Sequence, residues 1–246
     1  MANVIELKNV SFSAQDSRKI VQDVSVNFAE GKMTAIVGPS GGGKSTVLKI
    51  SAGLLVPNSG EVLYQGKNIT HMSRSENLDF RRESAFVFQD SALWANQDLY
   101  QNLELPLRIH YPKMEKKERE KRIKEVAVMS DYKKDLHVRP ARLSMGEQKL
   151  VGFARAMLCN PSLLYLDEWV ESLDETSAEI LINIVKRKRK EGATVIFVCH
   201  DMRIVIELAE QIVVVVDGQV TANAPKEALI RDLHTKDFLK VEETVS

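Results

Sequence analysis

The sequence has little cysteine and no excess of either charge. Two cysteines, Cys159 and Cys199, occur among 246 residues, and neither belongs to a paired-cysteine motif, so a disulfide or zinc framework has no basis. Lysine plus arginine (34) equal aspartate plus glutamate (34), which gives no support for nucleic-acid binding through bulk charge. We therefore expect a reducing, cytoplasmic setting and no nucleic-acid partner.

The sequence also has no long hydrophobic run. The longest continuous one, Ile212 to Val216, ends at Asp217 and is far shorter than the roughly 20 residues needed to cross a bilayer. The segment Met1 to Val10 alternates polar with apolar residues, unlike the apolar core of a signal peptide. We expect a soluble chain that acts at a membrane only through a partner.

What the sequence does contain is a glycine-rich loop between an apolar run, Met33 to Val37, and a helical pattern. The loop reads Gly38, Pro39, Ser40, Gly41, Gly42, Gly43, Lys44, Ser45 and Thr46. Because glycine has no β-carbon, this backbone can wrap a phosphate and point successive N–H groups at it. Lys44 would reach the β- and γ-phosphates, and the Ser45 hydroxyl would hold Mg²⁺. An ordinary glycine-rich turn is the alternative, but every fixed position of a phosphate loop is present.

Strand and helix patterns alternate along most of the chain. Residues 4–28 alternate as strands do, and further strands are predicted by the segments Ser84–Phe88, Leu163–Leu166, Thr194–Cys199 and Ile212–Val216. Helices are predicted between the later strands, with Ile180, Ile184 and Val185 facing inward. This alternation predicts an α/β fold with a largely parallel sheet and helices on both faces.

Between about residues 90 and 158 the strand patterns give way to charged, helical sequence. Its densest charge run, Lys113 to Val126, has two interpretations. It is either a protein-binding surface or, as we favour, the solvated face of a helix. The region as a whole predicts a helical insert.

Polar residues follow several of the predicted strands, at the sheet edge where ligands collect in folds of this kind. They are Gln89, Asp167 with Glu168, and His200. Asp167 is placed to hold Mg²⁺ through water, opposite Ser45. Glu168 is the natural general base for a water attacking the γ-phosphate, a role that contributes about 10²- to 10⁴-fold in rate.

The other two residues complete this set. Gln89 can orient the attacking water or touch the metal, and His200 can donate to the γ-phosphate. Each residue alone has a plain structural interpretation, as a strand-end cap, a turn cap or a satisfied histidine. Their order along one chain favours ATP chemistry.

A further motif, Leu143 to Glu147, lies between the phosphate loop and Asp167, directly before a helical stretch. Alone it is a serine-and-glycine helix start. With the other motifs in this order, nearly the whole chain resembles the ATP-binding cassette (ABC) ATPases. By that resemblance the motifs are Walker A at 38–46, the Q-loop at Gln89, the signature at Leu143–Glu147, Walker B at Leu163–Asp167, the catalytic Glu168, the D-loop at Ser172–Asp174 and the switch His200.

The resemblance implies a single ABC ATPase domain over residues 1–246 that binds ATP and Mg²⁺. Its fold would be a P-loop NTPase with a RecA-like core and an antiparallel β-subdomain (1–89 and 159–246), a helical subdomain (about 90–158) and a C-terminal tail (about 235–246). Magnesium would be held by Ser45, Gln89 and Asp167.

The resemblance also implies a head-to-tail dimer of two copies. Ser144 and Gly146 lie at a helix N-terminus that can bind an anion, yet the γ-phosphate is already held by Lys44 of the same copy. The signature, together with Asp174 of the D-loop, would therefore serve the nucleotide of the other copy. Integral membrane permease subunits would receive the resulting motion through a groove beside Gln89.

Four positions depart from the family pattern. Glu147 replaces the commoner glutamine of the signature, which other family members tolerate. Met145 replaces a glycine in the signature, where positive φ would be costly. Trp169 replaces the proline that follows the catalytic glutamate, so the family pattern does not predict the course of the backbone from there into the D-loop. Ala14 stands where an aromatic residue usually stacks on adenine, and Phe12 is the candidate substitute.

The segment from Phe88 to Arg108 points to a branch of the family. Its residues Phe88-Gln89, Ala92-Leu93-Trp94, Asn102 and Pro106-Leu107-Arg108 are similar to those in ATPases of Mla- and Mce-associated phospholipid transporters, as are Met72–Ser75 and Asp237–Leu239. This predicts an ATPase on the inner face of the cell membrane that drives lipid movement to the outer envelope, with an Mce-domain lipid carrier as a further partner. The alternatives are an ATPase of a solute importer and a non-transport ATPase that signals to cell-wall enzymes.

Overall fold

The computed structural model describes residues 2–14 and 18–231. The chain divides into two compact units, which are described separately: unit 1 comprises Met1–Asn77 and Gly192–Ser246, and unit 2 comprises Leu78–Glu191. The predicted tail at 235–246 and the Asp237–Leu239 motif lie outside the described residues. The subdomain boundaries near residues 90 and 158 stay a prediction.

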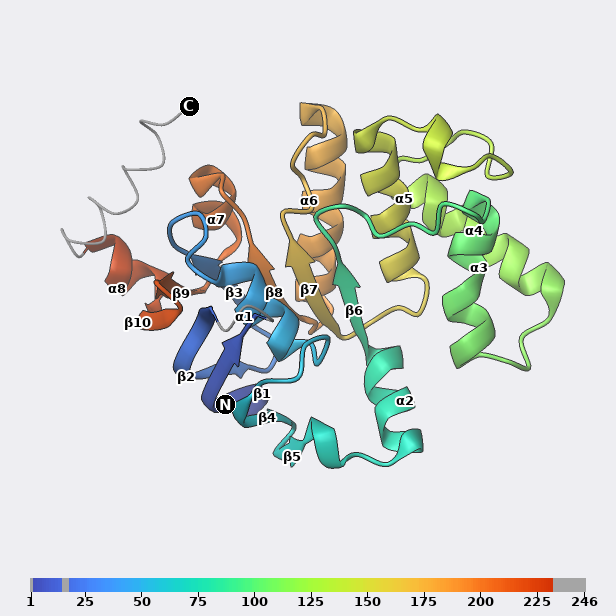
Figure 1. Cartoon of the computed structure of the whole chain (residues 1–246). Coiled ribbons are helices and arrows are strands. Elements are labelled where there is room, and N and C mark those ends of the chain that lie inside the picture. Colours follow the sequence, from blue (N-terminus) through green and yellow to red (C-terminus); the bar gives the residue numbers. More distant parts are fainter. Residues whose placement is uncertain (1, 15–17, 232–246) are drawn as a thin grey trace. The chain divides into compact units, whose positions relative to one another are not determined.

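Unit 1 contains an antiparallel sheet with the strand order β2-β1-β4-β5 (Figure 1). Its strands are β1 (Asn3–Ser13), β2 (Lys19–Ala29), β4 (Ser59–Tyr64) and β5 (Lys67–Asn68). In β2 the apolar Val24, Val26 and Phe28 are buried while Ser25 and Asn27 are exposed. The alternation in the sequence therefore predicted this strand and its two faces correctly.

Unit 1 also contains a parallel set of strands. The strand β3 (Met33–Val37) lies between β8 (Thr194–Val198) and β9 (Gln211–Val216) and is parallel to both, and β10 (Gln219–Pro225) adds to β9 in antiparallel sense. Every residue of β3 and β8 is buried, as continuous apolar runs predict for strands covered on both faces. The remaining elements are α1 (Lys44–Ser51), the 3₁₀ turn Ile69–His71, α7 (Met202–Leu208) and α8 (Lys226–Arg231).

Unit 2 combines a strand pair with helices. The strand β6 (Ser84–Val87) pairs in parallel with β7 (Leu163–Asp167). The helices are α3 (Leu99–His110), α4 (Lys116–Met129), α5 (Met145–Met157) and α6 (Glu175–Lys190), with a 3₁₀ turn at Pro140–Arg142. The helix α2 (Arg74–Glu83) leads directly into β6. The structure thus places helices α3, α4 and α5 where the charged sequence predicted them.

The charge run Lys113 to Val126 lies mostly on α4, which is the solvated helix that we expected. In α4 only Ile123, Val126 and Ala127 are buried, and they form one narrow apolar stripe. None of the helices within the described residues is long and apolar enough to cross a membrane.

Some element predictions were wrong in detail. The strand β6 was expected to be buried, but only Val87 is. In α6, Ile180 is half-buried, and Leu181 and Ile182 face inward along with Ile184 and Val185. The sequence interpretation also missed α2, β10 and α8. Helix α2 buries only Phe80 and α8 has only six residues, whereas β10 does alternate polar with apolar residues and was overlooked.

Candidate nucleotide-binding site

The glycine-rich loop of unit 1 joins the buried end of β3 to α1. Its lysine is directed back over the loop: Lys44 Nζ donates to the carbonyl oxygens of Gly38 at 2.6 Å and Pro39 at 3.0 Å, and Lys44 is only 6% exposed. Gly43 precedes the helix with φ 99°, a conformation that suits glycine because it lacks a β-carbon. The first N–H groups of α1 have no partner within the helix, as in any helix start, and so can bind an anion.

The loop is fastened to the hairpin between β9 and β10. Gly218 N donates to the Gly42 carbonyl oxygen at 2.9 Å. A β-carbon on Gly38 would lie 2.0 Å from the Val215 carbonyl oxygen, and Gly38 has φ 144°. Only glycine fits so close to β9, which fixes the start of the loop at the carboxyl end of β3.

His200 follows β8, the parallel neighbour of β3. The carboxyl ends of parallel neighbours meet at the same edge of a sheet, so the His200 and Gly38 backbones share that edge of unit 1. The next residue, Asp201, accepts from Arg203 N at 2.9 Å and so begins α7. The pKa of Asp201 is lowered chiefly by hydrogen bonds from the Arg203 side chain, and the cap lowers it further.

In unit 2 the structure brings Gln89 and Glu168 together. Gln89 Nε2 donates to Glu168 Oε2 at 3.0 Å, and a longer bond of 3.4 Å reaches Glu171 Oε2. Glu168 follows β7 and is 8% exposed, with its backbone in the left-handed region at φ 47°. The pairing of β6 with β7 explains this contact, because the two residues follow adjacent strand ends.

Asp167 is the last residue of β7 and is 1% exposed. A hydroxyl oxygen from Ser45, an amide oxygen from Gln89 and a carboxylate from Asp167 are the hard oxygen donors that Mg²⁺ prefers, alongside phosphate and water. Within the described residues, no group of three or more histidine, cysteine or acidic side chains could form a metal cage by itself. The donor types therefore fit a magnesium ion that nucleotide phosphates also hold.

The signature segment forms the start of α5. Ser144 is the N-cap: its hydroxyl accepts from Glu147 N at 3.2 Å, while Glu147 Oε2 accepts from Ser144 N at 2.8 Å. This is a capping box. Lys134 donates to Glu147 at 2.5 Å and, as the largest cause, lowers the pKa of that carboxyl. The cap occupies the N–H groups of Ser144 and Glu147, and those of Met145 and Gly146 remain for an anion.

The concern about Met145 is resolved. Met145 is the first residue of α5 and is not among the positive-φ positions, so its β-carbon carries no conformational cost. Its side chain is 69% exposed. The expectation that a non-glycine residue would be costly here was wrong, because the backbone at this position is helical.

The path from Glu168 to the D-loop is a tight turn. Trp169 is fully buried, and Leu173 N donates to the Val170 carbonyl oxygen at 3.2 Å. Asp174 then caps α6, accepting from Ser177 N at 2.9 Å, and this bond holds its pKa below the ordinary range. A β-carbon on Gly146 would lie 3.0 Å from the Ser172 carbonyl oxygen. The signature and the D-loop of one chain are therefore in close contact within unit 2.

The sequence interpretation missed two cationic side chains in unit 2 that donate to main-chain carbonyl groups. Lys149, which is buried, donates from Nζ to the Glu168 carbonyl oxygen at 2.7 Å. Arg155, which is half-buried, donates to the carbonyl oxygens of Ser91 and Ala92 at 2.8 and 2.7 Å. Both are cations on an otherwise apolar face of α5, and that was the available signal.

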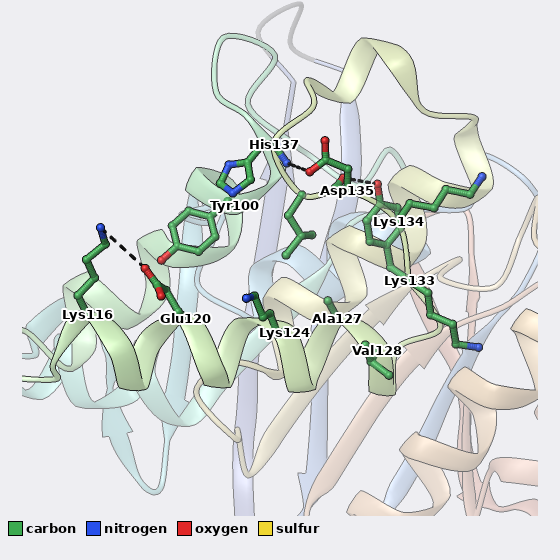
Figure 2. Close-up of a pocket in the computed structure, with 12 residues that line it drawn as sticks. Tyr100, Lys116, Glu120, Lys124, Ala127, Val128, Lys133, Lys134, Asp135 and His137 are labelled. Atoms are coloured by element: carbon green, nitrogen blue, oxygen red, sulfur yellow. Dashed lines mark hydrogen bonds and ion pairs between the residues drawn. The ribbon is translucent and has the colours of Figure 1, made fainter.

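A pocket of about 620 Å³ lies elsewhere in unit 2, between α3, α4 and residues 132–137. Figure 2 shows the rings of Tyr100 and His137 beside each other, stacked with centroids 5.5 Å apart. Burial raises the pKa of Tyr100. None of the predicted site residues lines this pocket.

Asp167 at the end of a buried strand and a glycine-rich loop that begins a helix define a P-loop ATPase. The sequence profile described as ABC transporter matches residues 21–171, and the chain belongs to the ABC transporter family. Its fold is the ABC ATPase fold, with a RecA-like core, an antiparallel β-subdomain and an inserted helical subdomain. The chain is an ATP-binding, ATP-hydrolysing transporter subunit of this family.

Two curated relatives illustrate the range of substrates. The intermembrane phospholipid transport system ATP-binding protein MlaF of Haemophilus influenzae is 32% identical over 98% of this chain and 91% of its own length. The methionine import ATP-binding protein MetN of Clostridium acetobutylicum is 32% identical over 92% of this chain and 70% of its own length. These names do not agree on a substrate.

Among solved structures, the ATP-binding cassette MJ0796 is similar, with a TM-score of 0.83 and 32% identity over 90% of this chain and 98% of that one. That structure is a dimer in a post-hydrolysis state bound to ADP and Pi.

Proposed function

We propose that Glu168 is the general base of ATP hydrolysis and that Gln89 holds it. The contact between the two at 3.0 Å carries this proposal, since it places a buried carboxylate beside a residue able to orient water. A base within hydrogen-bond reach of the attacking water contributes about 10²- to 10⁴-fold in rate. His200 would donate to the γ-phosphate.

Lys44 and residues 38–46 would bind the ATP phosphates of their own copy. Ser45, Asp167 and Gln89 would hold Mg²⁺. The ion supplies neutralisation of the phosphate charge that develops during transfer. The adenine contact stays a prediction: Ala14 cannot stack, and Phe12, half-buried on β1 opposite Val21, is the candidate.

The proposed working form is a head-to-tail homodimer in which Ser144, Gly146 and Asp174 serve the nucleotide of the partner copy. The dimeric MJ0796 structure supports the formation of a dimer. ATP would join the two copies, and hydrolysis with phosphate release would remove the charge that held them.

The proposed cargo is phospholipid, moved between the inner membrane and the outer envelope. Support comes from the similarity to MlaF over nearly the full length of both chains and from the segment after Gln89. There Asn102, 1% exposed, accepts from Trp94 N at 2.8 Å and donates to the Trp94 carbonyl oxygen at 3.2 Å. The hydrogen bonds of Asn102 thus join the two parts of the phospholipid-type pattern, the part that ends at Trp94 and the part that begins at Asn102. The Trp94 side chain itself is 50% exposed.

Trp94 is the proposed contact for the integral membrane permease, on the cytoplasmic face of the cell membrane. Exposed aromatic side chains are typical anchors of protein interfaces. Co-purification from membranes, followed by identification of bound chains and lipids, tests the assignment. A permease with an Mce-domain protein and phospholipid supports it. A periplasmic solute-binding protein would instead favour the polar-solute importer that the similarity to MetN suggests, and a cell-wall enzyme partner would favour signalling.

A further inference from the structure

Lys149 is a buried cation that touches the main chain of the proposed general base. It lies on α5, is 3% exposed, and donates from Nζ to the Glu168 carbonyl oxygen at 2.7 Å. Its ammonium also lies 3.8 Å from Glu171 Oε2. Burying an ammonium group is costly unless the group is paired and hydrogen-bonded. The contacts with Glu168 and Glu171 offset that cost for Lys149.

The carbonyl that Lys149 holds belongs to a residue in an uncommon conformation. Glu168 has φ 47°, a left-handed backbone that is unfavourable for a non-glycine residue because its β-carbon crowds the main chain. Such a conformation persists only where surrounding contacts determine it. A charge-assisted bond to its carbonyl oxygen is one such contact, and it fixes the direction in which the Glu168 side chain leaves the backbone.

Two contacts therefore hold Glu168 from opposite ends. Lys149 holds the carbonyl oxygen, and Gln89 holds the carboxylate at 3.0 Å. Glu171 reaches both holders, at 3.8 Å from Lys149 and 3.4 Å from Gln89. The proposed base is thus oriented by side chains from two separate elements of unit 2.

Lys149 follows the signature on the same helix. The α5 N-cap is Ser144, and Lys149 lies on the second turn of the helix, since one turn takes about 3.6 residues. Both residues belong to one continuous helix, so a displacement of its N-terminus would also displace Lys149.

We propose that Lys149 is a positioning residue that orients Glu168 and transmits to it the state of the α5 N-terminus. When the partner's nucleotide engages Ser144 and Gly146, α5 carries Lys149 with it and sets the backbone of Glu168 for catalysis in its own copy. This rests on the proposed function, because it takes Glu168 as the base and the signature as a partner-facing anion site.

The test measures steady-state ATP hydrolysis by K149M and K149R. K149M is expected to lower kcat about 10²-fold, as a misplaced catalytic group does, while KM stays within about twofold because the phosphate loop is untouched. K149R keeps a cation and hydrogen-bond donors at this position, so its kcat is expected to stay within about fivefold of that of the unchanged protein. Should K149M not fold, K149Q takes its place, since its amide has neither the charge nor the reach.

Lys188 provides a matched control for losing a buried ammonium. It lies on α6, is 8% exposed, and donates to Asn160 Oδ1 at 2.9 Å. K188M should lower the melting temperature as K149M does but leave kcat unchanged. Equal kcat losses in K149M and K188M would make the Lys149 effect merely structural and overturn the proposal.

A double variant separates this proposal from the proposed function. With E168Q present, adding K149M should lower the residual kcat no further, because Lys149 acts only through the base. An additional loss equal to that of K149M alone overturns the positioning role. If E168Q itself hydrolyses ATP normally, the assignment of the base fails. If E168Q is inactive and K149M is normal, only the role of Lys149 fails.

Discussion

Gln89 and Glu168 are far apart in the sequence, yet the amide of one donates to the carboxylate of the other at 3.0 Å. The parallel pairing of β6 and β7 produces this contact, because both residues follow the carboxyl ends of adjacent strands. Gln89, which contacts the proposed base, also begins the segment that presents Trp94. The proposed base and the proposed permease contact therefore belong to one connected part of unit 2.

Replacing Glu168 by glutamine should nearly abolish ATP hydrolysis and retain ATP binding. The carboxylate that accepts a proton from water is lost, while the phosphate loop is unchanged, so kcat should fall about 10²- to 10⁴-fold. Phosphate release measures the loss, and size-exclusion chromatography with ATP should show a stable dimer. E171Q is the matched control, since Glu171 also accepts from Gln89 but its side chain is 56% exposed. Turnover by E168Q within a few fold of the unchanged protein would remove Glu168 from the role.

Replacing Ser144 by alanine should prevent dimer formation with ATP as well as weaken a helix cap. Loss of an N-cap costs about 1 kcal/mol, and D98A matches that cost because Asp98 forms a similar capping box at the start of α3. Chemical denaturation should show comparable destabilisation of both variants. Only S144A should lose the ATP-dependent dimer in the E168Q background. Equal dimerisation by S144A and D98A would contradict a partner-facing role for the signature.

Replacing Gly60 by alanine should destabilise unit 1 more than replacing Gly66. Both glycines have similar φ, 83° and 79°, so alanine carries the same backbone cost of about 1–2 kcal/mol at each. A β-carbon on Gly60 would lie 2.3 Å from the Asn9 carbonyl oxygen, whereas at Gly66 nothing lies within 4 Å. Crowding should add about 1–3 kcal/mol for G60A. Urea denaturation of the two variants measures the difference, and equal midpoints would refute the close approach of β4 to β1.

Acid should destabilise the protein partly through His110. Burial, assisted by Arg82, lowers its pKa below 6.5, while Asp79 opposes this. The unfolded chain then binds more protons than the folded one at mildly acid pH, so stability falls as pH decreases through about 6.5 and is unaffected above it. H110F should show a smaller stability loss between about pH 7 and pH 5. Denaturation midpoints of H110F and the unchanged protein, measured across this pH range, test the prediction. If the midpoints of both proteins change equally with pH, His110 does not cause the acid destabilisation.

Several site residues could be predicted from the sequence because they follow apolar runs that form strands, although in β6, before Gln89, only Val87 is buried. The apolar runs before Gly38, Gln89, Asp167 and His200 predicted strands, and parallel pairing places their ends at common edges. The helix start at Ser144 followed from capping chemistry, whereas the start of α6 at its N-cap Asp174 was not predicted. Apolar runs and helix caps involve residues that are close together in the sequence, so a single sequence is enough to predict them.

The parts that could not be predicted depend on contacts distant in sequence. Nothing near Lys149 indicates that its ammonium reaches the Glu168 carbonyl oxygen, since the contact exists only once α5 packs beside the end of β7. The positive-φ concern at Met145 came from family expectation, and the helix start at Ser144 removed it. The β10 strand was missed although its residues alternate between exposed and half-buried positions, and its pairing with β9 stabilises it.

The bond from Gly218 N to the Gly42 carbonyl oxygen also limits how the protein can be engineered. A tag, a protease site or a circular-permutation break placed in the β9–β10 hairpin would release the nucleotide loop from its anchor, even though the hairpin is remote from that loop in sequence. Insertions for labelling are better placed at the Gln65–Gly66 turn, where a side chain meets open space.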